Sequence, residues 1–166
     1  MYLSHAHRTA IPSTDCRWDH FRGAGPGGQK KNKTSSAVRV THVPSGMSAT
    51  ASESRSQAEN KAAALRRLRH AMTLELRENI FLDRFQLPAD WDARKLRTSP
   101  RSEDYLAVMG YVLDVLSACR WVVSHAAERL GTTTAQLVRF LQNDEKLLDH
   151  VNRKRAKVAL GPLRSQ

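Results

Sequence analysis

The residues of this chain best suited to chemistry form a glycine-rich segment, Gly23 to Gln29. Four glycines and one proline fall within six residues, and Gly27-Gly28 lead directly into Gln29. Glycine serves where a backbone needs a positive φ or must approach a partner closely. The segment has no serine, cysteine, histidine or carboxylate. It therefore presents backbone N–H groups and one side-chain amide, which stabilise developing negative charge by hydrogen bonding.

The glycine segment is the first of five ordered sequence elements. The other four are Asn32-Lys33-Thr34, Ser36-Ala37-Val38-Arg39, Thr41-His42-Val43-Pro44-Ser45-Gly46, and the run Glu53-Ser54-Arg55-Ser56-Gln57 with Asn60-Lys61 after it. In this order and register, residues 15–80 resemble the peptide-release (GGQ) domain of class I translation release factors. A GGQ triplet alone is weak evidence, whereas five elements in register are specific.

The resemblance implies hydrolysis of the ester joining a nascent peptide to transfer RNA, in the peptidyl transferase centre of the large ribosomal subunit. Gly27, Gly28 and Gln29 are the implied catalytic residues. The main-chain N–H of Gln29 would donate to the charge that develops on oxygen, and its side-chain amide would help to admit water. The resemblance also implies that a dedicated glutamine methyltransferase methylates the Gln29 side chain at N5. It implies no metal or organic cofactor.

Basic and polar residues around this segment predict contacts with ribosomal RNA. Lysines can pair with phosphates as point charges, and arginines can do so with two hydrogen bonds. Asn32 and Thr34 are expected to hold the base of the loop by hydrogen bonds. The alternative for Arg39 is a solvated strand residue. The predicted RNA-binding residues are Arg22, Lys30, Lys31, Asn32, Lys33, Thr34, Arg39 and Arg55.

Two other interpretations of the glycine segment are weaker. A flexible turn between strands does not explain the elements that follow. A phosphate-binding P-loop needs Gly-x4-Gly-Lys-Ser/Thr, which is absent. Codon-reading release factors usually carry His-Val after the glutamine, whereas this chain has Lys30-Lys31, as in small stand-alone relatives. About 14 residues precede the domain and no codon-reading motif follows it, so we expect codon-independent release that rescues stalled ribosomes or large subunits.

Composition favours a polyanionic partner. The chain has 27 Lys and Arg against 16 Asp and Glu, a net charge of +11. Such a balance favours a nucleic-acid or anionic-membrane partner, although a merely soluble basic surface remains an alternative. Cys16 and Cys119 are far apart and lack ligand-like neighbours, which indicates reduced thiols in a cytoplasmic protein. No run of about 18 apolar residues predicts a membrane span.

Hydrophobic periodicity predicts an α+β chain of two parts. Strands are expected at 15–22, 36–43 and 47–53, with a turn at Pro44-Ser45-Gly46 and a helix at 57–80 that packs on the sheet through Ala58, Ala62, Leu65, Leu68, Met72 and Leu76. Four more helices are expected at 103–119, 121–130, 133–142 and 144–157. The predicted divisions are an N-terminal extension (1–14), the GGQ domain (15–85), a linker with a short turn near Trp91 (86–102) and an all-α domain with a short basic end (103–166).

The predicted helical domain suggests a second function. Residues 126–137 resemble a helix-turn-helix, because Gly131 stops one helix and the following threonines can cap the next. A non-enzymatic RNA-binding or ribosome-binding protein that uses this unit is the alternative function. A solvated helical face is the alternative for the candidate contacts, and the basic end could instead act as a tail that senses the ribosome. These candidates are Arg129, Gln136, Arg139, Lys146 and Arg153.

The partners expected for the chain are ribosomal RNA, peptidyl-tRNA and the methyltransferase, and we expect a monomer.

Overall fold

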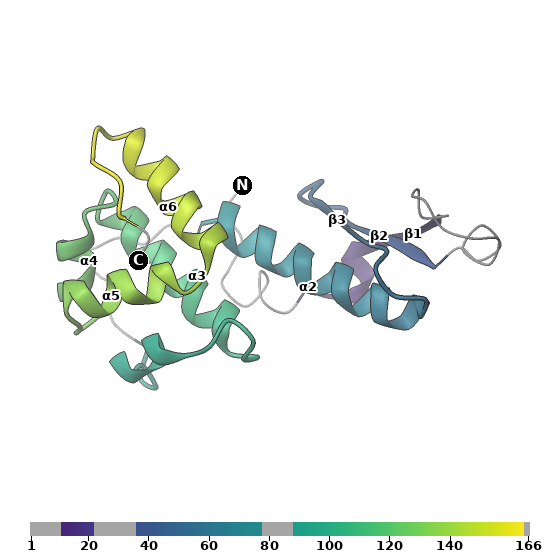
Figure 1. Ribbon diagram of the computed structural model, residues 1–166, viewed down its shortest axis with the longest axis horizontal. Helices are drawn as coiled ribbons and strands as arrows, with labels where there is room; N and C mark the ends of the chain where they lie inside the picture. Colours follow the sequence, from purple (N-terminus) through teal and green to yellow (C-terminus); the bar gives the residue numbers. More distant parts are fainter. Residues whose placement is uncertain (1–10, 22–35, 78–87, 165–166) are drawn as a thin grey trace. The chain divides into compact units, whose positions relative to one another are not determined.

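The computed structural model describes residues 11–21, 36–77 and 88–164, and divides into two compact units after Glu75 (Figure 1). The first unit combines a small β-sheet with one long helix. The helices and strands assigned in the second unit's described residues are all helices. The predicted α+β class is therefore confirmed.

Three antiparallel strands form the described sheet of the first unit, in the order β1-β2-β3. They are β1 (Cys16–Phe21), β2 (Ala37–His42) and β3 (Ser48–Ala51). The central strand β2 buries Val38, Val40 and His42 on one face, as its alternation predicts. All three predicted strands are present, each slightly shorter than expected.

The turn between β2 and β3 needs its glycine. Gly46 has φ +70°, a conformation that other residues rarely adopt. Its N–H donates to the carbonyl of His42 at 2.8 Å, and the His42 N–H donates to the carbonyl of Met47 at 2.8 Å. The predicted turn at residues 44–46 is confirmed.

Helix α2 (Gln57–Glu75) covers one face of this sheet. Ser56 caps it, because its Oγ accepts a hydrogen bond from the Glu59 N–H at 3.4 Å. The buried row runs at four-residue spacing through Asn60, Ala64, Leu68 and Met72. This row follows from the right-handed geometry of an α-helix, in which residues i and i+4 share a face.

Two details of the predicted helix are wrong. Ala58 and Ala62 were expected to face inward, but both are exposed. The inward position between them is Asn60, which is buried and hydrogen-bonded. The helix was also expected to reach residue 80. It ends at Glu75. Leu76 and Arg77 belong to the second unit, where Arg77 pairs with the buried Asp114.

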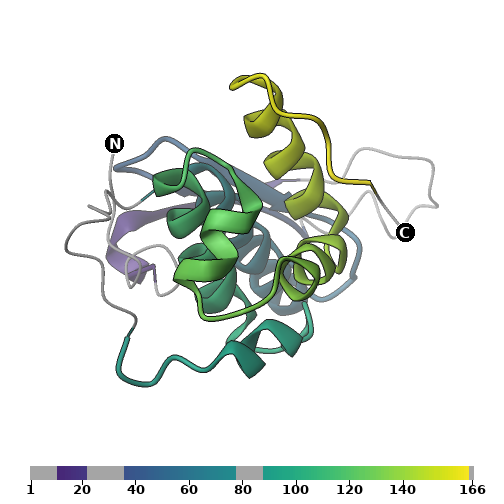
Figure 2. The same ribbon diagram turned by 90° about the vertical axis from the view of Figure 1, so that its left-hand side faces the viewer.

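The second unit is built from five helical segments in its described residues, which face the viewer in Figure 2. Each of the four α-helices lies within its predicted range, and a short 3-10 helix marks the turn expected near Trp91. The segments are η3 (Ala93–Arg97), α3 (Tyr105–Ala118), α4 (Val123–Arg129), α5 (Thr134–Gln142) and α6 (Glu145–Ala156).

The junction between α4 and α5 has the predicted stop and cap. Gly131 takes φ +64° just after α4. Thr133 and Gln136 then form a capping box: the Thr133 Oγ1 accepts from the Gln136 N–H, and the Gln136 Oε1 accepts from the Thr133 N–H. The helix-turn-helix interpretation of residues 126–137 agrees with this local structure.

Buried polar groups in the second unit are paired across helices. The Tyr105 hydroxyl donates to Asp144 Oδ2 at 3.1 Å, and the same carboxylate caps α6. Burial, together with Asp144, raises the pKa of Tyr105 far above its usual range. Arg77 and Asp114 form a second pair at 3.4 Å, with Asp114 only 1% exposed.

The length and hydropathy of the described helices indicate whether any of them could span a membrane. No single one of them is long and apolar enough to cross a bilayer. The pair α3 and α4 meets the length and composition test jointly, but it is bent by 120°. Most of the apolar residues of α3 are buried within the helical unit.

Loss of the buried ion pair should destabilise the helical unit. Asp114→Asn leaves the Arg77 guanidinium without its carboxylate, and we expect about 3–5 kcal/mol of lost stability in urea unfolding. Asp149→Asn is the matched control, because it breaks an exposed pair with Arg153 and should cost about 0.5 kcal/mol. Equal losses for the two variants would contradict the role assigned to the buried pair.

Candidate functional site

The predicted catalytic residues lie between two paired strands. Gly27, Gly28 and Gln29 belong to residues 22–35, which connect β1 to β2 and lie outside the described residues. The predicted RNA-binding residues within this connection are Arg22, Lys30, Lys31, Asn32, Lys33 and Thr34, and they also lie outside them. The structure does describe both ends of the connection. Phe21 and Ala37 are Cα partners in the β1–β2 ladder, so these ends meet at one edge of the sheet.

Asn60 fixes the strand-β2 side of this connection. Its Nδ2 donates to the carbonyl of Ser36 at 2.7 Å and to the carbonyl of Ser54 at 2.8 Å. Its Oδ1 accepts from the Ser54 N–H at 3.0 Å. Because the side chain is 1% exposed, these bonds replace water. One amide thereby joins helix α2, the turn before it and the residue that precedes β2.

The role of Asn60 was not predicted, although the sequence contains a signal for it. Asn60 stands four residues before Ala64, in the same row as Leu68 and Met72. A polar residue within an apolar row is buried only if its hydrogen bonds are satisfied. Its position in the row therefore indicated an anchoring amide.

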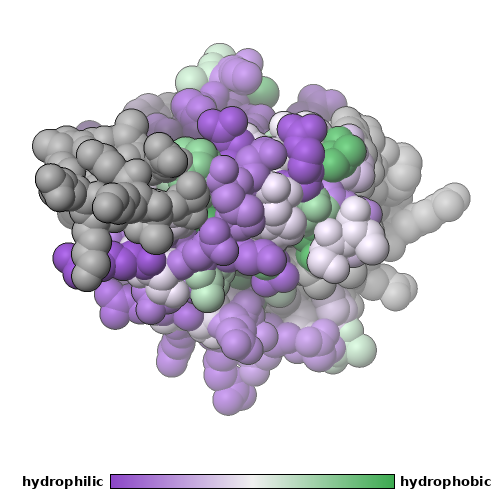
Figure 3. Space-filling model, turned by 90° about the vertical axis from the view of Figure 1, so that its right-hand side faces the viewer, coloured by the Kyte–Doolittle hydropathy of each residue, from purple (hydrophilic) through white to green (hydrophobic). Residues whose placement is uncertain are grey.

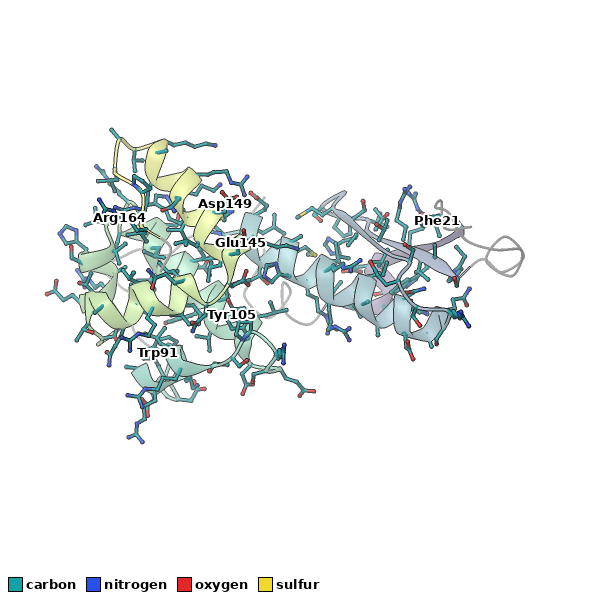
Figure 4. The ribbon with its side chains drawn as sticks, viewed as in Figure 1. Phe21, Trp91, Tyr105, Glu145, Asp149 and Arg164 are labelled. Carbon is teal, nitrogen blue, oxygen red and sulfur yellow. The ribbon has the colours of Figure 1, made fainter. Side chains whose placement is uncertain are left out.

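Arg39 lies on the outer face of the sheet. It is exposed, and its register partners are Asp19 on β1 and Thr50 on β3. The guanidinium carbon lies 5.6 Å from the ring centroid of Phe21, which is within the range of a cation–π contact. Figure 4 shows Phe21 at the end of β1. Arg39 is thus held beside the predicted catalytic connection, and its RNA contact stays a prediction.

Arg55 occupies the exposed turn that leads into α2. It forms no ion pair with a described residue. The nearby Glu53 is compensated instead by Arg67, whose guanidinium lies 2.9 Å from its carboxylate and also donates to the Thr50 carbonyl. The hydrogen bond from Arg67 to the Glu53 carboxylate lowers the pKa of Glu53. Arg55 is exposed, and its contact with an RNA phosphate stays a prediction.

A second cation–aromatic pair lies on the helix side of the sheet and was missed from sequence. Lys61 Nζ on α2 is 4.6 Å from the ring centroid of Trp18 on β1. The face in Figure 3 is largely hydrophilic where its residues are described. Exposed cations of the first unit include Arg17, Lys61 and Arg66. This unit therefore offers positive charge on both sides of its sheet.

The candidate contacts of the helical unit do not form one cluster. Arg129, Gln136, Arg139, Lys146 and Arg153 are all exposed. Of these, Gln136 and Arg139 line the same pocket, whereas Arg153 is paired with Asp149 at 3.2 Å. They share exposure, which permits contact with RNA, but only two of them share a site.

The basic end of the chain is folded back onto the helices up to Arg164. Asn152 makes two hydrogen bonds with the backbone of Leu163, at 2.9 and 2.7 Å. Gln142 Nε2 donates to the carbonyl of Arg164, and Arg155 Nε donates to the carbonyl of Gly161. The described end therefore packs against α5 and α6.

Side chains that could ligate a metal do not gather in the described ranges, where no three or more His, Cys, Asp or Glu residues cluster. Both cysteines are free. Burial raises the pKa of Cys119 and of Cys16, which disfavours their thiolates.

Asn60→Ala should release the strand-β2 end of the catalytic connection. The substitution leaves backbone groups of Ser36 and Ser54 unpaired, and we expect about 1–3 kcal/mol of lost stability for the first unit in urea unfolding. The control Ser48→Ala removes an exposed hydroxyl from β3 and should change stability by less than about 0.5 kcal/mol. An Asn60→Ala protein as stable as the control would refute the anchoring role.

Comparison with known proteins places this site in a family. Residues 5–86 match the RF-1 domain. The chain is 44% identical over 80 residues to peptide chain release factor 2 of Beutenbergia cavernae and 48% identical over 68 residues to that of Saccharopolyspora erythraea. These matches cover 48% and 41% of this chain, but only 21% and 18% of the relatives. The chain thus spans about a fifth of the length of the relatives it matches. Residues 5–86 therefore form an RF-1 domain of the class I peptide chain release factor family.

Proposed function

We propose that this chain hydrolyses peptidyl-tRNA on the ribosome without reading a codon, and so rescues stalled ribosomes or large subunits. The observation that carries the proposal is the position of Gly27-Gly28-Gln29 within the matched RF-1 domain. The paired strands on either side of residues 22–35 support it, because they hold both ends of the connection at one sheet edge.

The reaction is the addition of water to an ester. Water attacks the carbonyl carbon, and negative charge develops first on the carbonyl oxygen and then on the ribose oxygen of the tRNA. The carbon–ribose oxygen bond breaks, the ribose oxygen takes a proton, and the peptide leaves as a carboxylic acid. The Gln29 N–H donates a hydrogen bond to the developing charge. A backbone donor suits this step because it is fixed in place before charge forms.

The surrounding residues position this donor. Gly27 and Gly28 permit close approach of the backbone to the ester. The Gln29 side-chain amide helps to admit water and to exclude larger nucleophiles. Lys30, Lys31 and Lys33 pair with ribosomal RNA phosphates, with Arg39 and Arg55 extending the contact. These contacts with RNA, away from the reacting atoms, hold the Gln29 N–H in the correct orientation toward the ester.

Codon independence is supported by a local departure from codon-reading factors. Lys30-Lys31 follow Gln29 where those factors usually carry His-Val, so the segment is more similar to that of small stand-alone relatives. Two lysines next to the tip strengthen attraction to RNA. The ribosome, peptidyl-tRNA and a glutamine methyltransferase are the proposed partners of a monomeric cytoplasmic protein.

A non-enzymatic RNA-binding protein is the second candidate. The exposed Arg139 on α5, next to a well-capped helix-turn-helix junction, favours this function. It gives no role to Gln29, because a docking scaffold does not need an amide at the tip of its loop. A Gln29→Ala protein that still binds ribosomes but no longer releases peptide would therefore favour the enzyme over the RNA-binding protein.

Substitutions at the tip should abolish release and spare binding. Gly28→Ala displaces the Gln29 donor, and we expect the release rate to fall by about 10²–10³-fold. Gln29→Ala should also block release, because the pocket for water is lost. The measurement is release of a labelled peptide from ribosomes, with cosedimentation to follow binding. Gln142→Ala is the control, and it should release peptide as the wild type does.

The alternative has a distinct outcome in the same assay. If the wild-type protein binds ribosomes but releases no peptide from any complex, and Gln29→Ala binds less well, the enzyme is ruled out. If Gln29→Ala releases peptide at the wild-type rate, Gln29 has no catalytic role.

Methylation of Gln29 gives a further prediction. Natively sourced protein should carry one added methyl group on the peptide that contains Gln29, as measured by mass spectrometry. Protein with Gln29→Ala should carry none. An unmodified wild-type peptide would contradict the proposed methyltransferase partner.

A further inference from the structure

A pocket of about 240 Å³ lies between η3 and α5 in the helical unit. Its apolar lining is Ala93, Leu96 and Phe140, of which Leu96 and Phe140 are buried. Its polar lining is Arg97, Gln136, Arg139 and Asn143, all exposed. The pocket contains no carboxylate and lies outside the residues that match the RF-1 domain.

The polar lining is rich in hydrogen-bond donors. Arginine has donors only. Gln136 Oε1 accepts from the Thr133 N–H at 3.3 Å and from the Thr132 hydroxyl at 2.8 Å. Since a backbone N–H can only donate, this bond fixes which end of the amide is oxygen. The Nε2 amino group is therefore the end of Gln136 left for a ligand, and the pocket calls for a ligand rich in acceptors.

The charge of the pocket is also uncompensated. Arg97 and Arg139 form no ion pair with a described residue. The neighbouring cations of η3 are paired. Arg94 pairs with Asp92 at 3.1 Å, and Lys95 pairs with Asp90 at 2.6 Å. Two unpaired guanidiniums at one small site favour an anion that both can bind.

We propose that this pocket binds a phosphate of single-stranded RNA, with the attached ribose or base against Leu96 and Phe140. Guanidinium groups bind phosphate with two parallel hydrogen bonds. The apolar surface suits a base face, which is accessible when the strand is unpaired. The volume is below the roughly 300–1,000 Å³ of complete ligand sites, which suits one unit of a polymer. The choice of RNA over an acidic peptide rests on the proposed function and on the net charge of +11.

Binding of a fluorescein-labelled oligouridine to the full chain tests this site. We expect Arg97→Gln and Arg139→Gln each to raise the dissociation constant about tenfold, the loss typical of a hydrogen bond to a charged group. Each should also lower the slope of log K against log salt by about 0.7 for the lost phosphate contact. Arg94→Gln is the matched control: it removes the same charge from the same short helix outside the pocket, and should change affinity less than twofold.

Several outcomes would overturn the inference. The pocket takes no RNA phosphate if Arg97→Gln and Arg139→Gln bind oligouridine as tightly as Arg94→Gln does. If these variants keep RNA binding and lose binding of an oligoglutamate peptide, the partner is a protein. The RNA-binding assay contains no ribosome. If the wild-type protein releases no peptide in the ribosome assay, the proposed function is refuted, but the comparison of the arginine variants can still be interpreted.

Discussion

Antiparallel pairing between β1 and β2 is the constraint on which the first unit depends. The ladder makes Phe21 and Ala37 partners, so residues 22–35 must leave and re-enter the sheet at one edge. Asn60 then joins Ser36 to the turn that opens α2. If residues 22–35 act as proposed, fixed ends reduce the conformational freedom to be lost on meeting the substrate. The amide of one helix residue thus fixes the end of the segment that carries the proposed chemistry.

Two residues of the matched domain have a structural role in the hairpin next to this ladder. His42 is fully buried, with its Nδ1 2.7 Å from the Ser45 hydroxyl. Gly46 supplies the positive φ of the turn. Neither residue needs to meet a substrate, since each holds the β2–β3 hairpin that carries Arg39 and receives α2. The helical unit has its own buried polar pairs, Tyr105 with Asp144 and Arg77 with Asp114.

Much of the fold was predictable because its signals are local. Alternation in 36–43, the turn at 44–46 and the stop at Gly131 each depend on a few neighbouring residues. On α2, the row indicated that Asn60 is buried, but its partners Ser36 and Ser54 could not be read from the helix pattern. The ion pair just beyond the end of α2 joins Arg77 to a residue distant in sequence, Asp114. The pocket between η3 and α5 combines residues about 40 apart, which periodicity does not bring together.

The most direct measurement is the rate of peptide release by the wild-type protein from ribosomes that hold a labelled peptidyl-tRNA. The complexes to compare carry an empty messenger channel, a sense codon or a stop codon, with isolated large subunits beside them. We expect release without a stop codon, fastest from the empty channel or the large subunit. Release confined to stop codons would contradict codon independence and assign this chain to decoding termination.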